Sequence, residues 1–297
     1  MALRDFALLV LICLVWASNN IVSKIVVAHW GVPPLFYATV RFALVSLVTI
    51  PWLFPAPKPL WRIVMVALLM GGGNFALLFI GLKTASPSTA AIVGQLGVPM
   101  TTLLSVIMLG ERIRWRRGLG IALTFAGALL VIWQPGGLNF SGGALYVVGS
   151  ALTGSLGAVM MKQMEGVKPL RFQAWVGFCS FWPLALASFF TEHGQIATAG
   201  GAGWGFIAAV TFSALIVSVV AHTGYYSLIL KYEANLISPL TLLTPLFTIG
   251  LGIAITHDRF DTRMAFGAAL ALLGVLIIAV RGNRVMPLLL TVRNRAQ

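Results

Sequence analysis

The chain has 297 residues, of which 59% are hydrophobic and only 9% are charged. A soluble domain carries about 25% charged residues, so this composition excludes a water-soluble protein and indicates a chain surrounded by lipid. The net charge is +13, but the basic side chains lie in short loops between apolar runs. That placement indicates membrane orientation rather than binding to nucleic acid. The sequence therefore predicts an all-α integral membrane protein.

Ten apolar runs are each long enough to cross a bilayer, which takes about 20 helical residues. Turn signals separate the runs, among them Pro33-Pro34, Ser86-Pro87 and Gly200-Gly201. Polar residues interrupt the first run and no small-residue cleavage site follows it, so we interpret it as a retained helix rather than a signal peptide. We expect transmembrane helices over residues 5–28, 33–54, 62–83, 86–109, 115–134, 142–164, 171–191, 203–230, 234–256 and 263–281.

Basic residues divide unequally between the two alternating sets of loops. One set holds 15 Lys and Arg residues and the other holds four. Because cytoplasmic loops are enriched in Lys and Arg, the first set is expected to face the cytoplasm. This predicts a multi-pass plasma-membrane protein with both termini in the cytoplasm, a cytoplasmic loop at 112–117 and an external loop at 136–142.

The two halves of the sequence resemble each other. Gly120 and Gly127 in the fifth predicted helix correspond to Gly267 and Gly274 in the tenth. Each half holds five helices, and because five is odd the second half must enter the membrane from the opposite side. Such inverted repeats recur in transporters, in which two halves rock about a site near the midplane. We expect one membrane domain with a first repeat over 1–137, an inverted second repeat over 138–283 and a basic cytoplasmic tail over 284–297.

Polar side chains recur at helical spacing within several predicted helices, and in membranes such residues usually face protein or a watery cavity. Ser and Thr can instead bond their own helix carbonyls, and Asn can join helices. Aromatic side chains could line an apolar pocket. The candidate substrate-binding residues are Trp16, Asn19, Asn20, Asn74, Phe79, Gln95, Pro99, His222, Tyr225, Thr244 and Pro245.

Backbone irregularities are expected in the same helices. Pro99 and Pro245 each remove a mid-helix donor and should kink the helix. Gly71-Gly72-Gly73 should weaken the third helix. Two interpretations stay open: carbonyls freed by the prolines bind a substrate ammonium, or the bends are static and only shape the cavity. Arg41 lies about two turns into the second helix, and we expect it to bind helix-end carbonyls in a structural role.

The sequence contains few residues of the kinds that bind cations, phosphates or metals or that act in catalysis. All seven acidic residues lie at predicted helix ends or in loops, which argues against cationic drugs as substrates and against carboxylate-linked proton antiport. No phosphate-binding Gly-x-x-x-x-Gly-Lys-Ser/Thr loop and no Cys/His cluster is present. We therefore expect no enzyme activity, no catalytic residue, no cofactor and no metal. The expected partners are a small-molecule substrate and membrane lipid, without nucleic acid, for a monomeric chain.

Several motifs together carry a resemblance to a known family. They are Trp16-Ala-Ser-Asn19 with Lys24, Ala38-Thr-Val-Arg41-Phe42, Leu82-Lys83-Thr-Ala-Ser-Pro-Ser-Thr-Ala-Ala91, Pro99 and Leu109-Gly110-Glu111-Arg112. In order and spacing they resemble the ten-helix EamA-type branch of the drug/metabolite transporter superfamily over nearly the whole chain. Two details depart from the family pattern: one residue fewer separates Pro99 from Glu111, and Asp258 stands where Glu is common.

The resemblance implies a basket of helices around a central cavity. It also implies alternating-access export of small neutral or zwitterionic metabolites, because bacterial inner-membrane members mostly export amino acids; the chain looks most like exporters of aromatic and other neutral amino acids. Without a deep carboxylate, we expect no ion coupling, and a neutral, hydrogen-bonding His222. The alternatives are a sugar or nucleotide-sugar carrier, for which only Arg41 supplies deep positive charge, a membrane-embedded enzyme and a channel.

Overall fold

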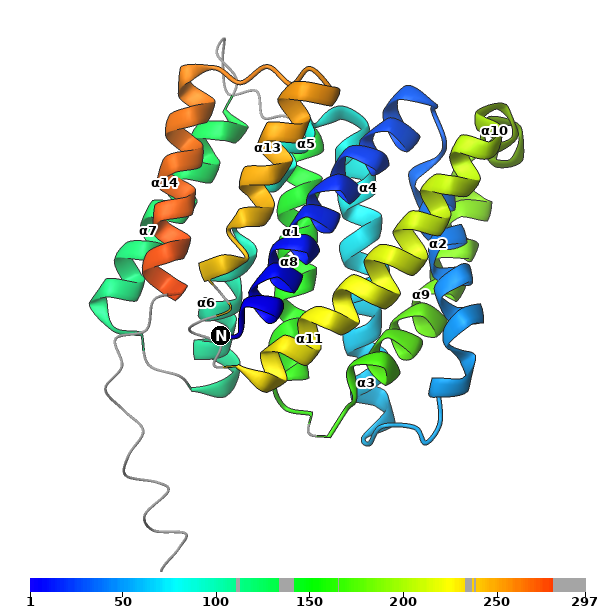
Figure 1. The fold of residues 1–297 in the computed structure, drawn as a ribbon, viewed down its shortest axis with the longest axis horizontal. Coiled ribbons are helices and arrows are strands. Elements are labelled where there is room, and N and C mark those ends of the chain that lie inside the picture. The colour runs from blue at the N-terminus through cyan, green and yellow to red at the C-terminus, as the bar shows by residue number, and fades with distance from the viewer. Residues whose placement is uncertain (111–112, 134–141, 165, 233–236, 238, 280–297) are drawn as a thin grey trace, which may run out of the picture.

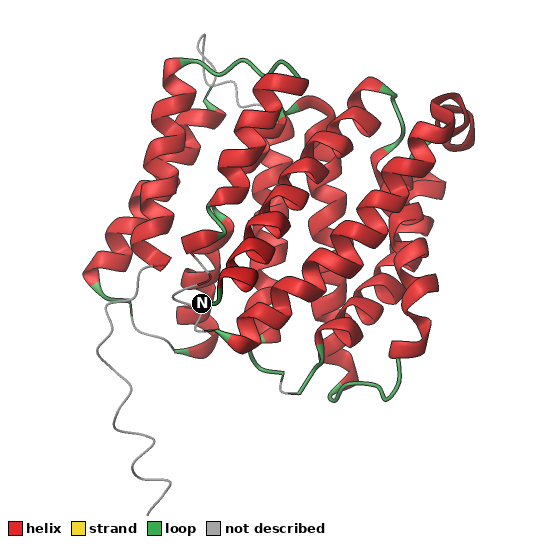
Figure 2. Ribbon diagram, viewed as in Figure 1, coloured by secondary structure: helices red, strands yellow, loops and turns green. Residues whose placement is uncertain are grey.

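The computed structural model describes residues 1–110, 113–133, 142–164, 166–232, 237 and 239–279. Within these ranges the regular structure is helical and contains no strand (Figure 2). Nine helical spans are long and apolar enough to cross a membrane, and Leu243–Ile255 is a shorter apolar helix in the place of the ninth predicted one. The expected all-α membrane fold is thus confirmed. The predicted basic tail at 284–297 and the Glu111-Arg112 motif lie outside the described residues.

Several of the spans are built from more than one helical segment. The elements used below are α1 (Leu3–Lys24), α2 (Pro34–Thr49), α3 (Leu60–Ala67), η3 (Leu68–Gly73), α4 (Asn74–Thr84), α5 (Pro87–Gly94), α6 (Gly97–Leu109), α7 (Trp115–Ile132), α8 (Gly142–Met161), α9 (Pro169–Thr191), α10 (Gln195–Thr211), η4 (Phe212–Ala221), α11 (His222–Lys231), α13 (Leu243–Ile255) and α14 (Thr262–Ala279). Short helical segments also follow α1 at Ile25–His29 and α2 at Ile50–Trp52.

A helical segment that was not expected precedes the eighth predicted helix. That helix was predicted to start at residue 203, after a break at Gly200-Gly201; α10 begins at Gln195 and includes both glycines, and its break in helical geometry lies at residue 203. The Gln195 side chain donates hydrogen bonds to the carbonyls of Ser188 and Glu192, at 3.0 and 2.9 Å, which anchors the helix start to the end of α9. The chain instead deviates at Gly203, where φ is 54° and ψ is −132°.

The helices lie side by side in a broad bundle (Figure 1). At one edge α7 packs against α14, and at the other α2 packs against α9. Between these edges α1 packs against α13, η4 and α11, and α4 packs against α8. Contacts between elements from the two halves of the chain therefore form much of the bundle.

The α7–α14 contact follows the internal repeat. A Cβ atom added to Gly120 would lie 2.7 Å from the Gly274 carbonyl oxygen, and one added to Gly267 would lie 2.8 Å from the Gly127 carbonyl oxygen. Only glycine allows the two backbones to approach so closely. Because Gly120 corresponds to Gly267 and Gly127 to Gly274, the contact presents equivalent surfaces on both helices, as an isologous interface does.

Two π-helical segments also occupy equivalent positions. In the first half η3 ends at Gly73 and α4 begins at Asn74, and in the second half η4 ends at Ala221 and α11 begins at His222. The glycine run thus lies within a π-helical segment rather than within a regular α-helix. Such segments are rare and widen the helix locally, often at functional sites. Asn74 and His222 are therefore placed alike, each just after a wide segment.

The helices that contain Pro99 and Pro245 break before the prolines rather than kinking at them. Turns precede α6 and α13, so each proline is the third residue of a new helix, where a backbone N–H would lack a helical partner anyway. The carbonyl oxygen of Gln95 accepts from Val98 N at 3.1 Å, and that of Thr241 accepts from Thr244 N at 3.0 Å. The carbonyls expected to be freed for a substrate ammonium are therefore already hydrogen-bonded.

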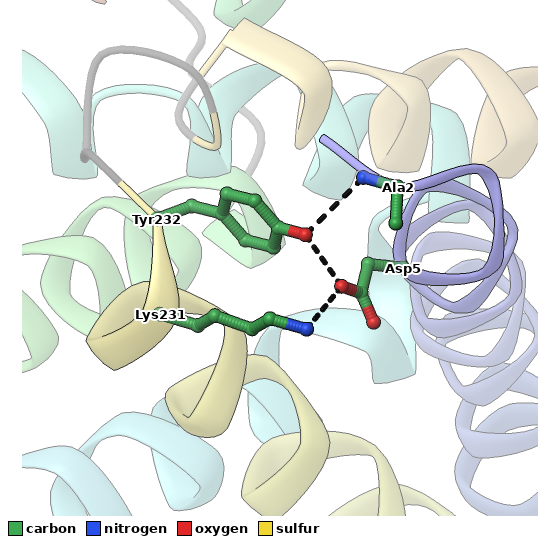
Figure 3. Close-up of polar contacts among 4 residues, drawn as sticks. All are labelled: Ala2, Asp5, Lys231 and Tyr232. Atoms are coloured by element: carbon green, nitrogen blue, oxygen red, sulfur yellow. Dashed lines mark hydrogen bonds and ion pairs between the residues drawn. The ribbon is translucent and has the colours of Figure 1, made fainter.

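Polar contacts fasten helix ends on both sides of the bundle. Lys231 Nζ lies 2.6 Å from Asp5 Oδ2, and the Tyr232 hydroxyl donates to the same oxygen, so that α1 is joined to the end of α11 (Figure 3). At the opposite ends of the helices, Glu192 accepts hydrogen bonds from the first backbone amides of α2, and Asp258 accepts one from Ser88 N in α5. Both carboxylates thus cap helix N-termini, where negative charge is favourable.

Candidate functional site

A cavity of about 140 Å³ lies between elements of the two halves. The first half contributes residues from α2, η3 and α4, and the second half from α8, α9, η4 and α11. Its lining consists of Phe42, Met70, Asn74, Phe75, Gly154, Phe172, Gln173, Val176, Ser218, His222 and Tyr226. Aromatic rings thus make up much of the wall, and a small set of amide, hydroxyl and imidazole groups interrupts it. Such a mixture is typical of small-molecule sites.

Asn74 lines this cavity and has an amide oxygen without a described partner. Its Nδ2 donates to the Ser150 carbonyl oxygen at 2.8 Å, and Ser150 Oγ donates to the backbone carbonyl of Asn74 at 2.8 Å. This reciprocal pair fixes α4 against α8 and sets the orientation of the amide. Within the described chain no hydrogen bond engages the Asn74 Oδ1 atom, so it remains able to accept one from a ligand.

His222 presents a second acceptor. Its Nδ1 lies 2.7 Å from the Val217 carbonyl oxygen. A carbonyl can only accept, so Nδ1 carries a proton; in the neutral form of the ring expected from the sequence, Nε2 is then an acceptor. Since Asn74 and His222 are equivalent positions of the repeat, each half of the chain supplies one polar residue with an acceptor atom to the lining of the same cavity.

Arg41 lies behind the cavity wall and has no solvent exposure. Its Nε and Nη2 donate to Ser218 Oγ at 3.1 and 2.8 Å. Its Cζ lies 4.0 Å from the centre of the Phe75 ring, a cation–π contact. The expected bonds to helix-end carbonyls are not found; η4 instead brings the Ser218 hydroxyl to the guanidinium. In the described part of the chain Nη1 has no hydrogen-bond partner, and no carboxylate pairs with Arg41.

Three predicted aromatic residues surround this region without lining the cavity. The Trp16 ring lies 5.2 Å from the His222 ring and 4.9 Å from the Tyr225 ring, between centroids. Phe79 is fully buried, and its ring packs against Phe75 at 5.8 Å. These contacts support the side chains that face the cavity.

The other predicted residues lie away from it. Asn19 Oδ1 accepts from Ser213 Oγ at 2.8 Å, and Asn20 Nδ2 donates to Thr248 Oγ1 at 3.4 Å, so both amides join helices. Among the described residues, Gln95 Nε2 donates to the Ala91 carbonyl of the preceding helix α5, at 3.5 Å.

Three more predicted residues stand in the first turns of the two broken helices. Pro99 and Pro245 are buried there. Thr244 Oγ1 is buried and has no hydrogen-bond partner among the described residues. Of the eleven predicted residues, only Asn74 and His222 line the cavity.

Gln173 is a lining residue that the sequence analysis missed. Its side chain is 4% exposed, and it lies in α9, which begins at Pro169. The sequence-based candidates did not include Gln173, although it lies inside the predicted helix over 171–191. An amide one turn inside an apolar helix is the signal that would have identified it.

Comparison with known proteins places this arrangement in a family. The EamA-like transporter family matches residues 5–133 and 141–280. The "probable amino-acid metabolite efflux pump" of Salmonella typhimurium is 26% identical over 96% of this chain and 97% of its own length. The protein of the same name from Escherichia coli is 25% identical, over 93% and 95%. The "uncharacterized inner membrane transporter YedA" of Escherichia coli is 26% identical, over 93% and 89%.

A solved crystal structure, 18% identical, covers the whole of both chains with a TM-score of 0.53, which supports the fold alone. The related sequences are named transporters or efflux pumps, not enzymes. The family match covers most of both halves, and the resemblance carried by the sequence motifs is confirmed. The chain is a multi-pass membrane transporter and belongs to the EamA-like transporter family.

Proposed function

We propose that the protein exports small neutral or zwitterionic metabolites, with amino acids, including aromatic ones, as the substrate class. The observation that carries this proposal is the cavity, in which two acceptors, Asn74 Oδ1 and His222 Nε2, stand among aromatic side chains. Acceptors suit an ammonium group, and aromatic walls suit an apolar side chain. The names of the Salmonella and Escherichia relatives point to the same substrate class.

Transport is proposed to follow the substrate gradient by alternating access, without ion coupling. In the described residues, the acidic side chains lie at helix ends or in loops, and none lines the cavity. A tenfold gradient already supplies about 1.4 kcal/mol. The proposed setting is the bacterial inner membrane, with a monomeric chain, repeats over 1–137 and 138–283, and both termini in the cytoplasm.

A sugar or nucleotide-sugar carrier remains the alternative within transport. It receives less support, because several basic groups would be needed for an anionic nucleotide and Arg41 is the one deep basic residue identified. The aromatic lining can stack against a sugar ring, so the choice between substrates rests on flux measurements.

The purified protein in liposomes tests the proposal. Flux of labelled amino acids, sugars and nucleosides is measured with and without an imposed pH difference. We expect amino-acid flux that His222→Ala or Asn74→Ala reduces, while Ser227→Ala, an exposed residue of α11, leaves it unchanged. Flux of sugars alone would contradict the proposed substrate class. Accumulation against the substrate gradient that an uncoupler abolishes would contradict uncoupled transport.

A further inference from the structure

Arg41 carries a positive charge that the described structure leaves without a counter-ion. Its side chain is fully buried, and among the described residues its hydrogen bonds go only to the neutral Ser218 hydroxyl, it stacks on the Phe75 ring, and its Nη1 donor has no partner. Burying a charged side chain costs free energy unless a group of opposite charge is buried beside it. A protein that keeps an arginine in this state is prepared for an anion that arrives from elsewhere.

The guanidinium is separated from the cavity by one layer of side chains. Ser218 and Phe75 both line the cavity, and both contact Arg41, at 2.8 Å from Nη2 to Ser218 Oγ and at 4.0 Å from Cζ to the Phe75 ring centre. Rotation of the Ser218 hydroxyl away from Arg41 would free Nε and Nη2, the two donors on one edge of the guanidinium. Such an edge binds a carboxylate with two parallel hydrogen bonds.

Arg41 lies close to His222, because Ser218 and Phe75, which contact Arg41, are both neighbours of His222. Ser218 and His222 are four residues apart, at the end of η4 and the start of α11, so they lie about one helical turn apart on the same side. The Phe75 ring contacts both Arg41 and His222, with its centre 4.0 Å from the Arg41 Cζ atom and 6.4 Å from the centre of the His222 ring. A donor for a carboxylate and an acceptor for an ammonium are therefore neighbours, as they are in an α-amino acid, whose two charged groups share one carbon.

We propose that Arg41 binds the substrate carboxylate, which replaces the Ser218 hydroxyl as the acceptor of its Nε and Nη2 groups, while the ammonium is bound by His222 and Asn74. The substrate is then required to carry a free carboxylate, and the substrate supplies the counter-ion of Arg41. This rests on the proposed function, since it names the part of an amino acid that the site recognises.

Phenylalanine and phenylalaninamide are the probes, because they differ only at the carboxyl group. In liposomes, the wild-type protein should transport phenylalanine at least tenfold faster than the amide at equal concentrations. Arg41→Gln should lower phenylalanine transport on the order of 10- to 100-fold, which corresponds to the loss of hydrogen bonds to a charged group. It should also abolish the preference for phenylalanine over the amide. Arg41→Lys should keep a reduced preference for the acid. Lys168→Gln, which removes an exposed basic residue, should behave as wild type.

Ser218→Ala distinguishes carboxylate binding by Arg41 from a purely structural role. If Ser218 is the acceptor that the carboxylate displaces, removing its hydroxyl should lower KM for phenylalanine and increase the acid-to-amide ratio. If Arg41 and Ser218 only hold α2 to η4, the variant should lose stability and treat both probes alike, and that result would overturn the inference. Retained discrimination in folded Arg41→Gln would overturn it too, while amino-acid export would stand. Wild-type protein that carries sugars but no amino acid would overturn both.

Discussion

Replacing Gly127 by alanine should force α7 and α14 apart. The new Cβ atom would lie 2.5 Å from the Ala271 backbone nitrogen and would also meet the Gly267 carbonyl oxygen, whereas ordinary contacts begin at 3.4 Å. Both obstacles are backbone atoms, so no side-chain rotation relieves the overlap and the whole helix has to move. Overpacking of this kind costs about 1–3 kcal/mol.

Gly118→Ala provides a control in the same helix. A Cβ atom at Gly118 has nothing within 4 Å, and alanine is favoured over glycine in a helix by about 0.8–1 kcal/mol. We therefore expect the two glycine-to-alanine changes to have opposite signs. Gly274→Ala should resemble Gly127→Ala, because it is the equivalent position on the other side of the contact.

Thermal denaturation of the purified variants, followed by size-exclusion chromatography in detergent and repeated in lipid nanodiscs, measures the difference. The expected order of melting temperature places Gly118→Ala at or above wild type and both contact variants below it. If Gly127→Ala were as stable as Gly118→Ala, the close approach of the two helices described above would be wrong. If only one of the contact variants were destabilised, the symmetry of the contact would be wrong.

Three further predictions concern helix ends and orientation. Glu192→Ala should lower the free energy of unfolding by about 0.5–2 kcal/mol, the contribution of an N-cap, because two backbone amides of α2 lose their acceptor. Thermal denaturation checks this, with Glu192→Gln, which keeps one acceptor oxygen, as the comparison. Equal stability of both variants and wild type would contradict it. Lys168→Cys should react with an impermeant thiol reagent only from the cytoplasmic side and His193→Cys only from outside, since the two exposed positions flank α9; the reverse pattern would invert the topology. Asp5→Asn should leave the melting temperature close to wild type at physiological salt. The Asp5 side chain is 14% exposed, but its Lys231 partner is 60% exposed, which limits the contribution of the ion pair, and asparagine keeps an oxygen that can accept from Tyr232; a large loss would show that the ion pair stabilises the fold.

Helix number and order were predictable because lipid imposes a simple rule on the sequence. A span needs a long apolar run, and the proline- and glycine-rich turns mark its limits. The helical segment from Gln195 to the break at Gly203 was not predicted, because adjacent glycines permit a break without requiring one, while the bonds that anchor Gln195 come from the end of α9. A local pattern cannot report a hydrogen bond to another helix.

The candidate site was predictable only where the repeat pointed to it. Asn74 and His222 correspond to each other between the halves, and both line the cavity. Asn19 and Asn20 are likewise amides within an apolar run, but their side chains form hydrogen bonds with Ser213 and Thr248. Which side of a helix faces a cavity depends on helix rotation and crossing, which hydrophobic runs without strong amphipathicity do not specify.

The paired glycines of α7 and α14 have a consequence for how such a chain could arise. Because equivalent residues meet on both sides of the contact, one helix surface suffices to build it. A separate five-helix chain with the same glycine spacing could therefore form this contact with a second copy inserted upside down. Two copies would then need membrane insertion in both orientations, which requires a nearly balanced loop charge. Joining the copies into one polypeptide removes that requirement, and each half is free to acquire its own loop charges and its own cavity side chain, amide in one and imidazole in the other.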